Sequence, residues 1–120
     1  MMDSRILYKT SEHLFHKVEW IRHDNNEWLY CGLSNDFNDG LVNTHLKEHF
    51  SDNSLYFILT RTGCYEFDLN DALLEIKGHI NDHTFSIWNT SFTKVMQFNL
   101  IGVFRKGSCA ANISLAKGRR

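Results

Sequence analysis

The feature that most constrains the fold of this chain is a series of short β-prone segments in its second half. Two of them are apolar and are separated by Thr62-Gly63, a typical hairpin signal. A third places Phe85 and Ile87 on one face, and in the last we expect Gly102 to form a bulge. The segments cover residues 55–60, 64–67, 84–88 and 94–105. This pattern predicts a mainly antiparallel sheet.

The first third of the chain is predicted to be helical where it begins. Ser11 suits an N-cap, and apolar residues follow at helical spacing through residues 14–21. The sequence leaves an alternative open, in which residues 18–22 form a strand that turns at residues 24–26. In both cases we expect residues 28–33 to form a strand.

Two further helices are expected before and within the sheet region. Residues 41–50 show helical spacing, and Asn70 can cap a short helix over residues 72–76 that Gly78 would end. Helices followed by strands indicate an α+β fold, with N-terminal helices packed on a mainly antiparallel sheet from the C-terminal half. Alternating apolar residues at 111–115 predict a last edge strand.

The size of the chain indicates one globular domain. It has 120 residues, of which 42% are apolar, so we expect a single domain over residues 1–120 with a basic C-terminal segment at 105–120. The longest apolar run, residues 55–59, is far shorter than the roughly 20 residues of a membrane helix. With no apolar leader and three cysteines that lack metal-type spacing, a cytoplasmic location and no membrane partner are expected.

The charge is distributed unevenly along the chain. Residues 1–100 contain eight Lys and Arg against fourteen Asp and Glu, whereas residues 101–120 contain five basic residues and no acid. An acidic body favours encounter with a basic partner and disfavours nucleic acid, while a basic tail favours contact with phosphates. The simplest alternative is that the acids form an ordinary solubilising surface.

Histidine pairs offer the clearest candidate for a metal site. His45 and His49 are four residues apart, with Glu48 available as a base, and His79 and His83 repeat this spacing. Residues 13 and 16 form a third pair of histidines. Surface or half-buried histidines without a ligand are the commoner outcome, so a small metal- or ligand-binding α+β enzyme that uses a histidine cluster is the alternative function.

Recognisable catalytic motifs are missing from the sequence. There is no G-x-S-x-G, no C-x-x-C and no glycine-rich phosphate loop. Glu66 and Asp68 share one strand face and would suit acid–base chemistry, although such a pair is more often the solvent face of a half-buried strand. We therefore expect no enzymatic activity, no cofactor and no direct nucleic-acid binding. The oligomeric state is left open.

The remaining surface suits protein recognition. Exposed Trp and Tyr are typical interface anchors, and carboxylates near turns supply negative charge. At least half of the aromatic residues are expected to form the core instead. The candidate partner-binding residues are Asp24, Glu27, Trp28, Tyr65, Glu66, Asp68, Asp71, Asp82 and Trp88.

Three segments in the second half resemble a known group of proteins. Residues 85–89, 92–96 and 99–103 are similar to the C-terminal halves of small bacterial immunity proteins, the antitoxins of contact-dependent growth inhibition and related polymorphic toxin systems. The resemblance covers roughly residues 80–107. It implies a non-enzymatic protein that binds a cognate toxin domain, often a basic nuclease, and occludes its active site. The basic tail departs from this pattern.

Overall fold

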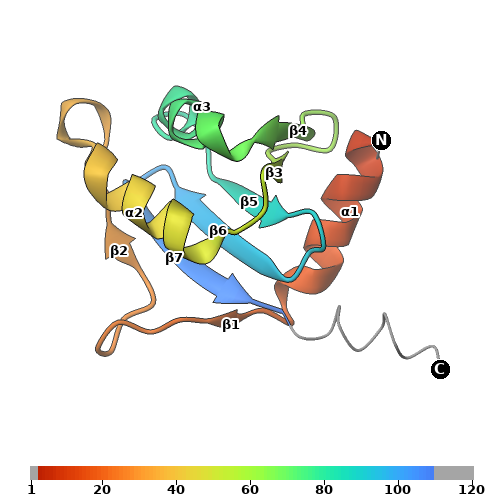
Figure 1. Ribbon diagram of the computed structural model, residues 1–120, viewed down its shortest axis with the longest axis horizontal. Coiled ribbons are helices and arrows are strands. Elements are labelled where there is room, and N and C mark those ends of the chain that lie inside the picture. Colours follow the sequence, from red (N-terminus) through yellow and green to blue (C-terminus); the bar gives the residue numbers. More distant parts are fainter. Residues whose placement is uncertain (1–2, 110–120) are drawn as a thin grey trace.

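The computed structural model describes residues 3–109 and contains a seven-stranded antiparallel sheet (Figure 1). Its strands are β1 (Glu19–Trp20), β2 (Leu29–Tyr30), β3 (Ser54–Ile58), β4 (Tyr65–Asp68), β5 (Phe85–Asn89), β6 (Lys94–Asn99) and β7 (Val103–Ser108). The order across the sheet is β1-β7-β6-β5-β3-β4, and β2 also pairs with β7. The strands that come last in the sequence therefore occupy the middle of the sheet.

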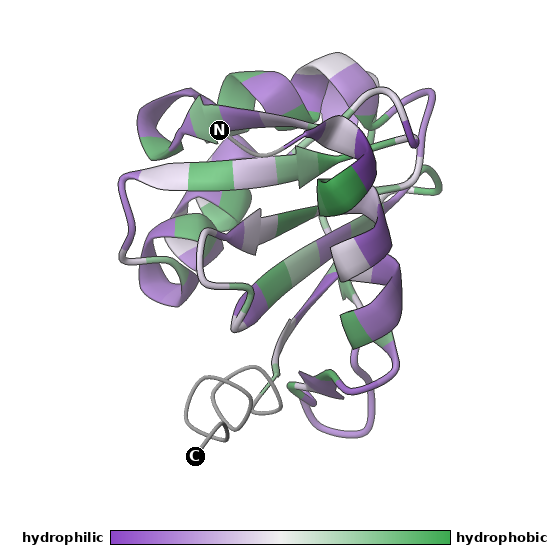
Figure 2. Ribbon diagram, turned by 90° about the vertical axis from the view of Figure 1, so that its right-hand side faces the viewer, coloured by the Kyte–Doolittle hydropathy of each residue, from purple (hydrophilic) through white to green (hydrophobic). Residues whose placement is uncertain are grey.

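Three helices cover the two faces of this sheet (Figure 1). On one face α1 (Ser4–Phe15) buries Leu7 and Leu14 against Trp88 and its neighbours. On the other face α2 (Asp39–His49) and α3 (Ala72–His79) bury Leu46 and Ile76. In Figure 2 the ribbon of each helix carries both hydrophilic and hydrophobic stretches, as expected for helices with one face on a core. Every residue of β5 is buried because both of its faces are covered.

This architecture confirms the predicted α+β class. The hairpin between β3 and β4 pairs Leu55 with Phe67, and in its turn the backbone N–H of Gly63 donates to the Thr60 carbonyl at 3.0 Å. The expected alternation of β5 is also confirmed, since Phe85 and Ile87 both lie in the core under α2 and α3. Helices occur at both places predicted from residues 41–50 and 72–76.

The prediction for the first helix was wrong in position. Ser11 lies inside α1 rather than at its N-cap, which is Asp3, and the helix ends at Phe15. The Ser11 hydroxyl is buried and accepts a hydrogen bond from the Trp88 indole at 2.8 Å. A side chain that suits a cap therefore serves as a tertiary hydrogen-bond partner in the middle of the helix, which the local sequence does not reveal.

The alternative hairpin around residues 24–26 is partly right. The chain does turn there, with a bridge between His23 and Asn26. The two flanking strands, however, do not pair with each other: β1 and β2 lie one after the other along the same edge of β7, where Trp20 is opposite Gly107 and Leu29 is opposite Phe104. Residues 21–28 thus form an excursion between two strands on one edge.

Two local predictions need correction. Gly102, with φ +93°, lies in the turn between β6 and β7 and is not a bulge within a single strand. The N-cap of α3 is Asp71 rather than Asn70, whose backbone N–H donates to the Asp68 carboxylate at 2.8 Å. The edge strand expected over residues 111–115 lies outside the described residues.

Two further properties concern the described residues as a whole. Within 3–109, no helix has the length and apolar character needed to cross a membrane. Cys31, Cys64 and Cys109 are free thiols buried in the core. Burial raises the pKa of Cys31 to about 11, so this thiol is protonated and unreactive at neutral pH.

Candidate functional site

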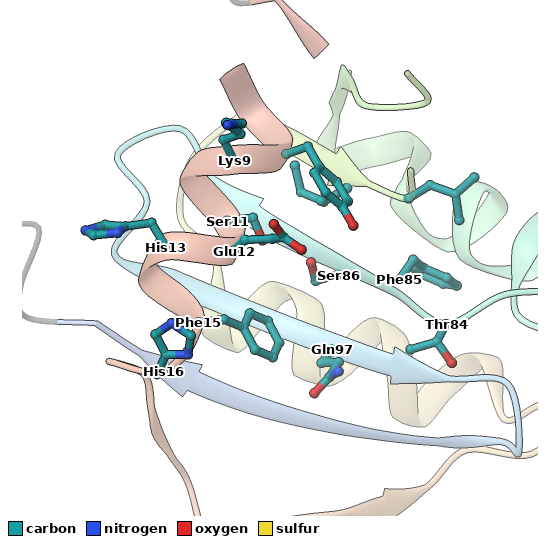
Figure 3. A pocket seen from close by; sticks show the side chains of 13 residues that line it. Lys9, Ser11, Glu12, His13, Phe15, His16, Thr84, Phe85, Ser86 and Gln97 are labelled. Carbon is teal, nitrogen blue, oxygen red and sulfur yellow. The ribbon is translucent and has the colours of Figure 1, made fainter. Parts of the chain in front are cut away.

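A cavity lies beside α1. Its volume is about 760 Å³, and it lies between α1 and strands β3, β5 and β6 (Figure 3). Cavities of a few hundred to a thousand Å³ are the usual size of small-ligand sites. The lining residues are Tyr8, Lys9, Ser11, Glu12, His13, Phe15, His16, Ile58, Leu59, Thr84, Phe85, Ser86 and Gln97.

The position of α1 creates this cavity. Leu7 and Leu14 anchor the helix by burial, and the hydrogen bond from Trp88 to Ser11 fixes its middle turn over β5. The cavity remains open beside the helix, where Phe15 and Ile58 provide apolar walls. The cavity therefore depends on how α1 is docked.

Two polar side chains form part of the cavity on the sheet side. Ser86 is only 6% exposed, and its hydroxyl has no hydrogen-bond partner within residues 3–109. The Gln97 carbonyl oxygen accepts from the Arg105 Nε at 2.8 Å, which leaves the two amide hydrogens of Gln97 available. The sheet thus offers hydroxyl and amide groups to anything bound beside α1.

The α1 side of the cavity carries a carboxylate. In Figure 3 the Glu12 carboxylate and the Ser86 hydroxyl point toward one another, whereas His13 points away. Glu12 forms none of the ion pairs found among residues 3–109. Its negative charge raises the pKa of Tyr8, one turn earlier on the helix, so the Tyr8 phenol stays protonated at neutral pH.

The histidines do not assemble into a metal centre in the described part of the chain. There, no group of three His, Cys, Asp or Glu side chains lies close enough to hold a metal ion. His49 Nε2 lies 3.2 Å from the Val95 carbonyl and 3.0 Å from the Gly107 carbonyl, so this nitrogen carries a hydrogen and donates. His45 packs against Phe104, with ring centroids 5.2 Å apart.

In the second histidine pair, His79 packs on the core and His83 is exposed. The ring of His79 lies 4.9 Å from that of Phe57, and His83 lies 5.9 Å from His79 between ring centroids. Of the third pair, both His13 and His16 line the cavity beside α1, and both are exposed.

Four of the predicted partner-binding residues lie at the β4 edge of the sheet. Glu66 and Asp68 are exposed on β4, which among residues 3–109 pairs only with β3, and Asp71 is exposed at the start of α3. Tyr65 is half-buried, stacks on Phe57 with centroids 5.1 Å apart, and donates its hydroxyl hydrogen to the Glu75 carboxylate. Burial, with that carboxylate, raises the pKa of Tyr65.

Three other predicted residues lie at the opposite edge, in or beside the excursion over residues 21–28. Asp24 is exposed in the turn, with φ 61°. Glu27 accepts from the Arg105 guanidinium at 2.8 Å, and Trp28 stacks on that guanidinium at 4.6 Å. Glu27 and Trp28 therefore have partners inside the protein.

The last two predicted residues differ in exposure. Asp82 is exposed just after α3. Trp88 is completely buried, and its indole N–H is used by Ser11, so its prediction as an exposed anchor was wrong. The structure therefore does not bring the predicted residues into one patch, because the sheet separates the β4 edge from the excursion.

The cavity itself was not anticipated from the sequence. One signal was present: Ser86 and Trp88 share a strand face, so a small polar residue occurs where alternation calls for a second apolar one. The pairing of Tyr8 with Glu12 depends on where α1 begins, which the sequence pattern misplaced. Comparisons with known proteins found no matching family model, no matching curated protein and no matching solved structure.

Proposed function

We propose that the protein is an immunity protein that binds a cognate bacterial toxin domain and occludes its active site, with no catalysis of its own. One observation carries this proposal. Of the fourteen acidic residues in the sequence, only Glu27 and Asp39 take part in the ion pairs among residues 3–109. Most carboxylates are thus free to pair with cations of another molecule, which favours a basic partner such as a nuclease.

The β4 edge is the best-supported part of this surface. A sheet edge offers backbone N–H and C=O groups to a strand of a partner, and charged side chains on the edge select which strand can add. Here Glu66 and Asp68 alternate along the edge, and Asp71 follows. A toxin segment whose Lys or Arg residues hold phosphates matches this pattern, and binding it would keep the substrate away.

A binding experiment tests the proposal. A toxin domain encoded in the neighbouring reading frame is the partner to be tested; it is mixed with the purified protein, and binding is followed by calorimetry. Charge reversal by Glu66→Lys with Asp71→Lys is expected to weaken binding by at least about a hundredfold, since each lost charge pair costs a few kcal/mol. The matched control, Glu19→Lys with Asp36→Lys, changes the same charge on exposed sites elsewhere and is expected to bind normally.

Two results would contradict the proposal. One is the absence of any complex between this protein and a neighbouring toxin domain. The other is an equal loss of affinity in the control and in the β4 variant, which would make the effect a general consequence of net charge. The histidine-based alternative predicts stoichiometric zinc in the purified protein, lost on His45→Ala or His49→Ala.

A further inference from the structure

The cavity beside α1 is lined by a serine hydroxyl. Ser86 is 6% exposed, and no hydrogen bond of its hydroxyl is found within residues 3–109. Buried polar groups in proteins are nearly always hydrogen-bonded, to protein or to ordered water. The Ser86 hydroxyl faces a cavity of about 760 Å³, where it is available to a molecule bound there.

Across the cavity from Ser86 lies a carboxylate, that of Glu12, which forms no ion pair within residues 3–109. The Glu12 carboxylate points into the cavity, and neither Lys9 nor His16, its helical neighbours, forms an ion pair with it (Figure 3). A carboxylate beside two hydroxyl groups, those of Tyr8 and Ser86, presents hydrogen-bond acceptors around one negative charge. That arrangement suits a cationic donor.

The other residues that line the cavity indicate the kind of chemical group to which the cation is attached. Phe15 and Ile58 are apolar and suit a hydrocarbon stem. The free amide hydrogens of Gln97, whose carbonyl oxygen is held by Arg105, suit a carbonyl or hydroxyl oxygen on the same ligand. Donors and acceptors at separate points of one cavity fix the orientation of a ligand as well as its charge.

We propose that this cavity binds a protonated amine or guanidinium group on an apolar stem, with Glu12 as its counter-ion and the Ser86 hydroxyl as an acceptor. Two sources offer this chemistry: the side chain of a Lys or Arg residue in a peptide segment, and a free alkyl amine or alkyl guanidine. The proposal does not depend on the toxin, because the site is defined by this chain alone.

The test is a titration followed by amide chemical shifts in two-dimensional NMR. The probes are agmatine for the free source, acetyl-Gly-Arg-Gly-amide for the peptide source, and N-butylurea as an uncharged analogue. Saturable shifts confined to α1, Ser86 and Gln97 are expected with agmatine, with the peptide or with both, and the more tightly bound probe identifies the source. N-butylurea is expected to bind at least about tenfold more weakly, since it lacks the charge.

Variants identify the groups responsible. Glu12→Gln removes the charge at an exposed position and is expected to weaken binding about tenfold, while Ser86→Ala weakens it a few-fold. The control Glu48→Gln removes an exposed carboxylate from α2, on the other face of the sheet, and is expected to leave binding unchanged. Equal binding of N-butylurea and agmatine, no effect of Glu12→Gln, or no saturable shifts at this cavity with either cation would each overturn the proposal.

Discussion

Arg105 shows how much of this structure depends on single side chains. Its guanidinium lies between the rings of Trp20 and Trp28, at 3.8 and 4.6 Å from their centroids. The same group donates to Glu27 and to Gln97, each at 2.8 Å. A planar cation with donors on several sides is needed for this arrangement, which is why lysine is not equivalent here. Arg105 thereby connects the excursion over residues 21–28 to the sheet.

Replacing Arg105 by methionine is expected to lower the free energy of unfolding by about 2 kcal/mol, because it removes a desolvated cation–π contact and its hydrogen bonds. Arg105→Lys is expected to lower the free energy of unfolding by most of the same amount. Urea unfolding followed by tryptophan fluorescence measures both. Lys94→Met, on the exposed part of β6, serves as the control and is expected to change stability by less than about 0.5 kcal/mol.

His49 makes stability depend on pH. Burial lowers its pKa to about 4, below the ordinary value of 6.5, so the folded protein holds a neutral ring while the unfolded chain binds a proton below pH 6.5. The contribution of the neutral His49 ring to the free energy of unfolding is fully present above pH 6.5 and is lost progressively as the pH falls to about 4. Between pH 7 and pH 5 the expected loss is about 2 kcal/mol.

An NMR titration of the His49 ring protons is the direct measurement of this effect. The ring is expected to stay neutral down to about pH 4 in the folded protein. Urea unfolding of His49→Gln at pH 7 and pH 5 gives the second measurement, in which the corresponding pH dependence is absent. A ring that titrates near pH 6.5 would show that the carbonyls of Val95 and Gly107 do not hold a neutral imidazole.

At the scale of elements, β1 packs closely on the edge of β7 because Gly107, which is opposite Trp20, has no side chain. An added Cβ at Gly107 would lie 2.5 Å from a Val18 methyl carbon and 2.9 Å from the Glu19 carbonyl oxygen. Gly78, in α3, has nothing within 4 Å of such a Cβ. The two glycines therefore differ in their surroundings in the folded protein, and the neighbouring residues in the sequence do not indicate this difference.

The pair therefore makes a matched test. Gly107→Ala is expected to push β1 away from β7 and to lower the free energy of unfolding by about 2 kcal/mol, whereas Gly78→Ala is expected to raise it by about 0.5 kcal/mol through helix propensity. Hydrogen exchange of the Ile21 amide, which donates to the Lys106 carbonyl at 2.8 Å, reports the loss of pairing. Unchanged protection of that amide in Gly107→Ala would contradict the packing argument.

Elements whose signals are local were predictable from the sequence, and those set by distant contacts were not. The β3–β4 hairpin follows from two apolar, β-prone segments and the Thr62-Gly63 turn between them, and β5 follows from its alternation. The start of α1 escaped prediction because Ser11 looks like a cap but serves as a partner for Trp88, 77 residues away. The cavity could not be predicted from the sequence either, because α1, β5 and β6 come together only in the folded chain.

At the scale of the whole molecule, two cores share one sheet. Leu14 belongs to the core under α1 and Leu46 to the core under α2 and α3, and β5 contributes side chains to both. Both cores pack on the same strands, so unfolding of one core exposes one face of the strands on which the other core is packed. The two sides are therefore expected to unfold together.

Two core variants test this coupling. Leu14→Ala and Leu46→Ala are each expected to cost about 2–5 kcal/mol, the usual range for a buried leucine. In both variants the unfolding curves from tryptophan fluorescence and from far-ultraviolet circular dichroism are expected to coincide. Separate transitions by the two probes in either variant would mean that the cores unfold independently.

The position of β7 has a consequence for how the chain acquires its structure during synthesis. β1 and β2 emerge from the ribosome early, but their pairing partner is residues 103–108, and β6 needs the same segment on its other side. Contacts between residues so far apart in sequence form slowly, because a long loop must close first. The strands β1 and β2 therefore stay without their pairing partner until residues 103–108 have been synthesised and have left the ribosome.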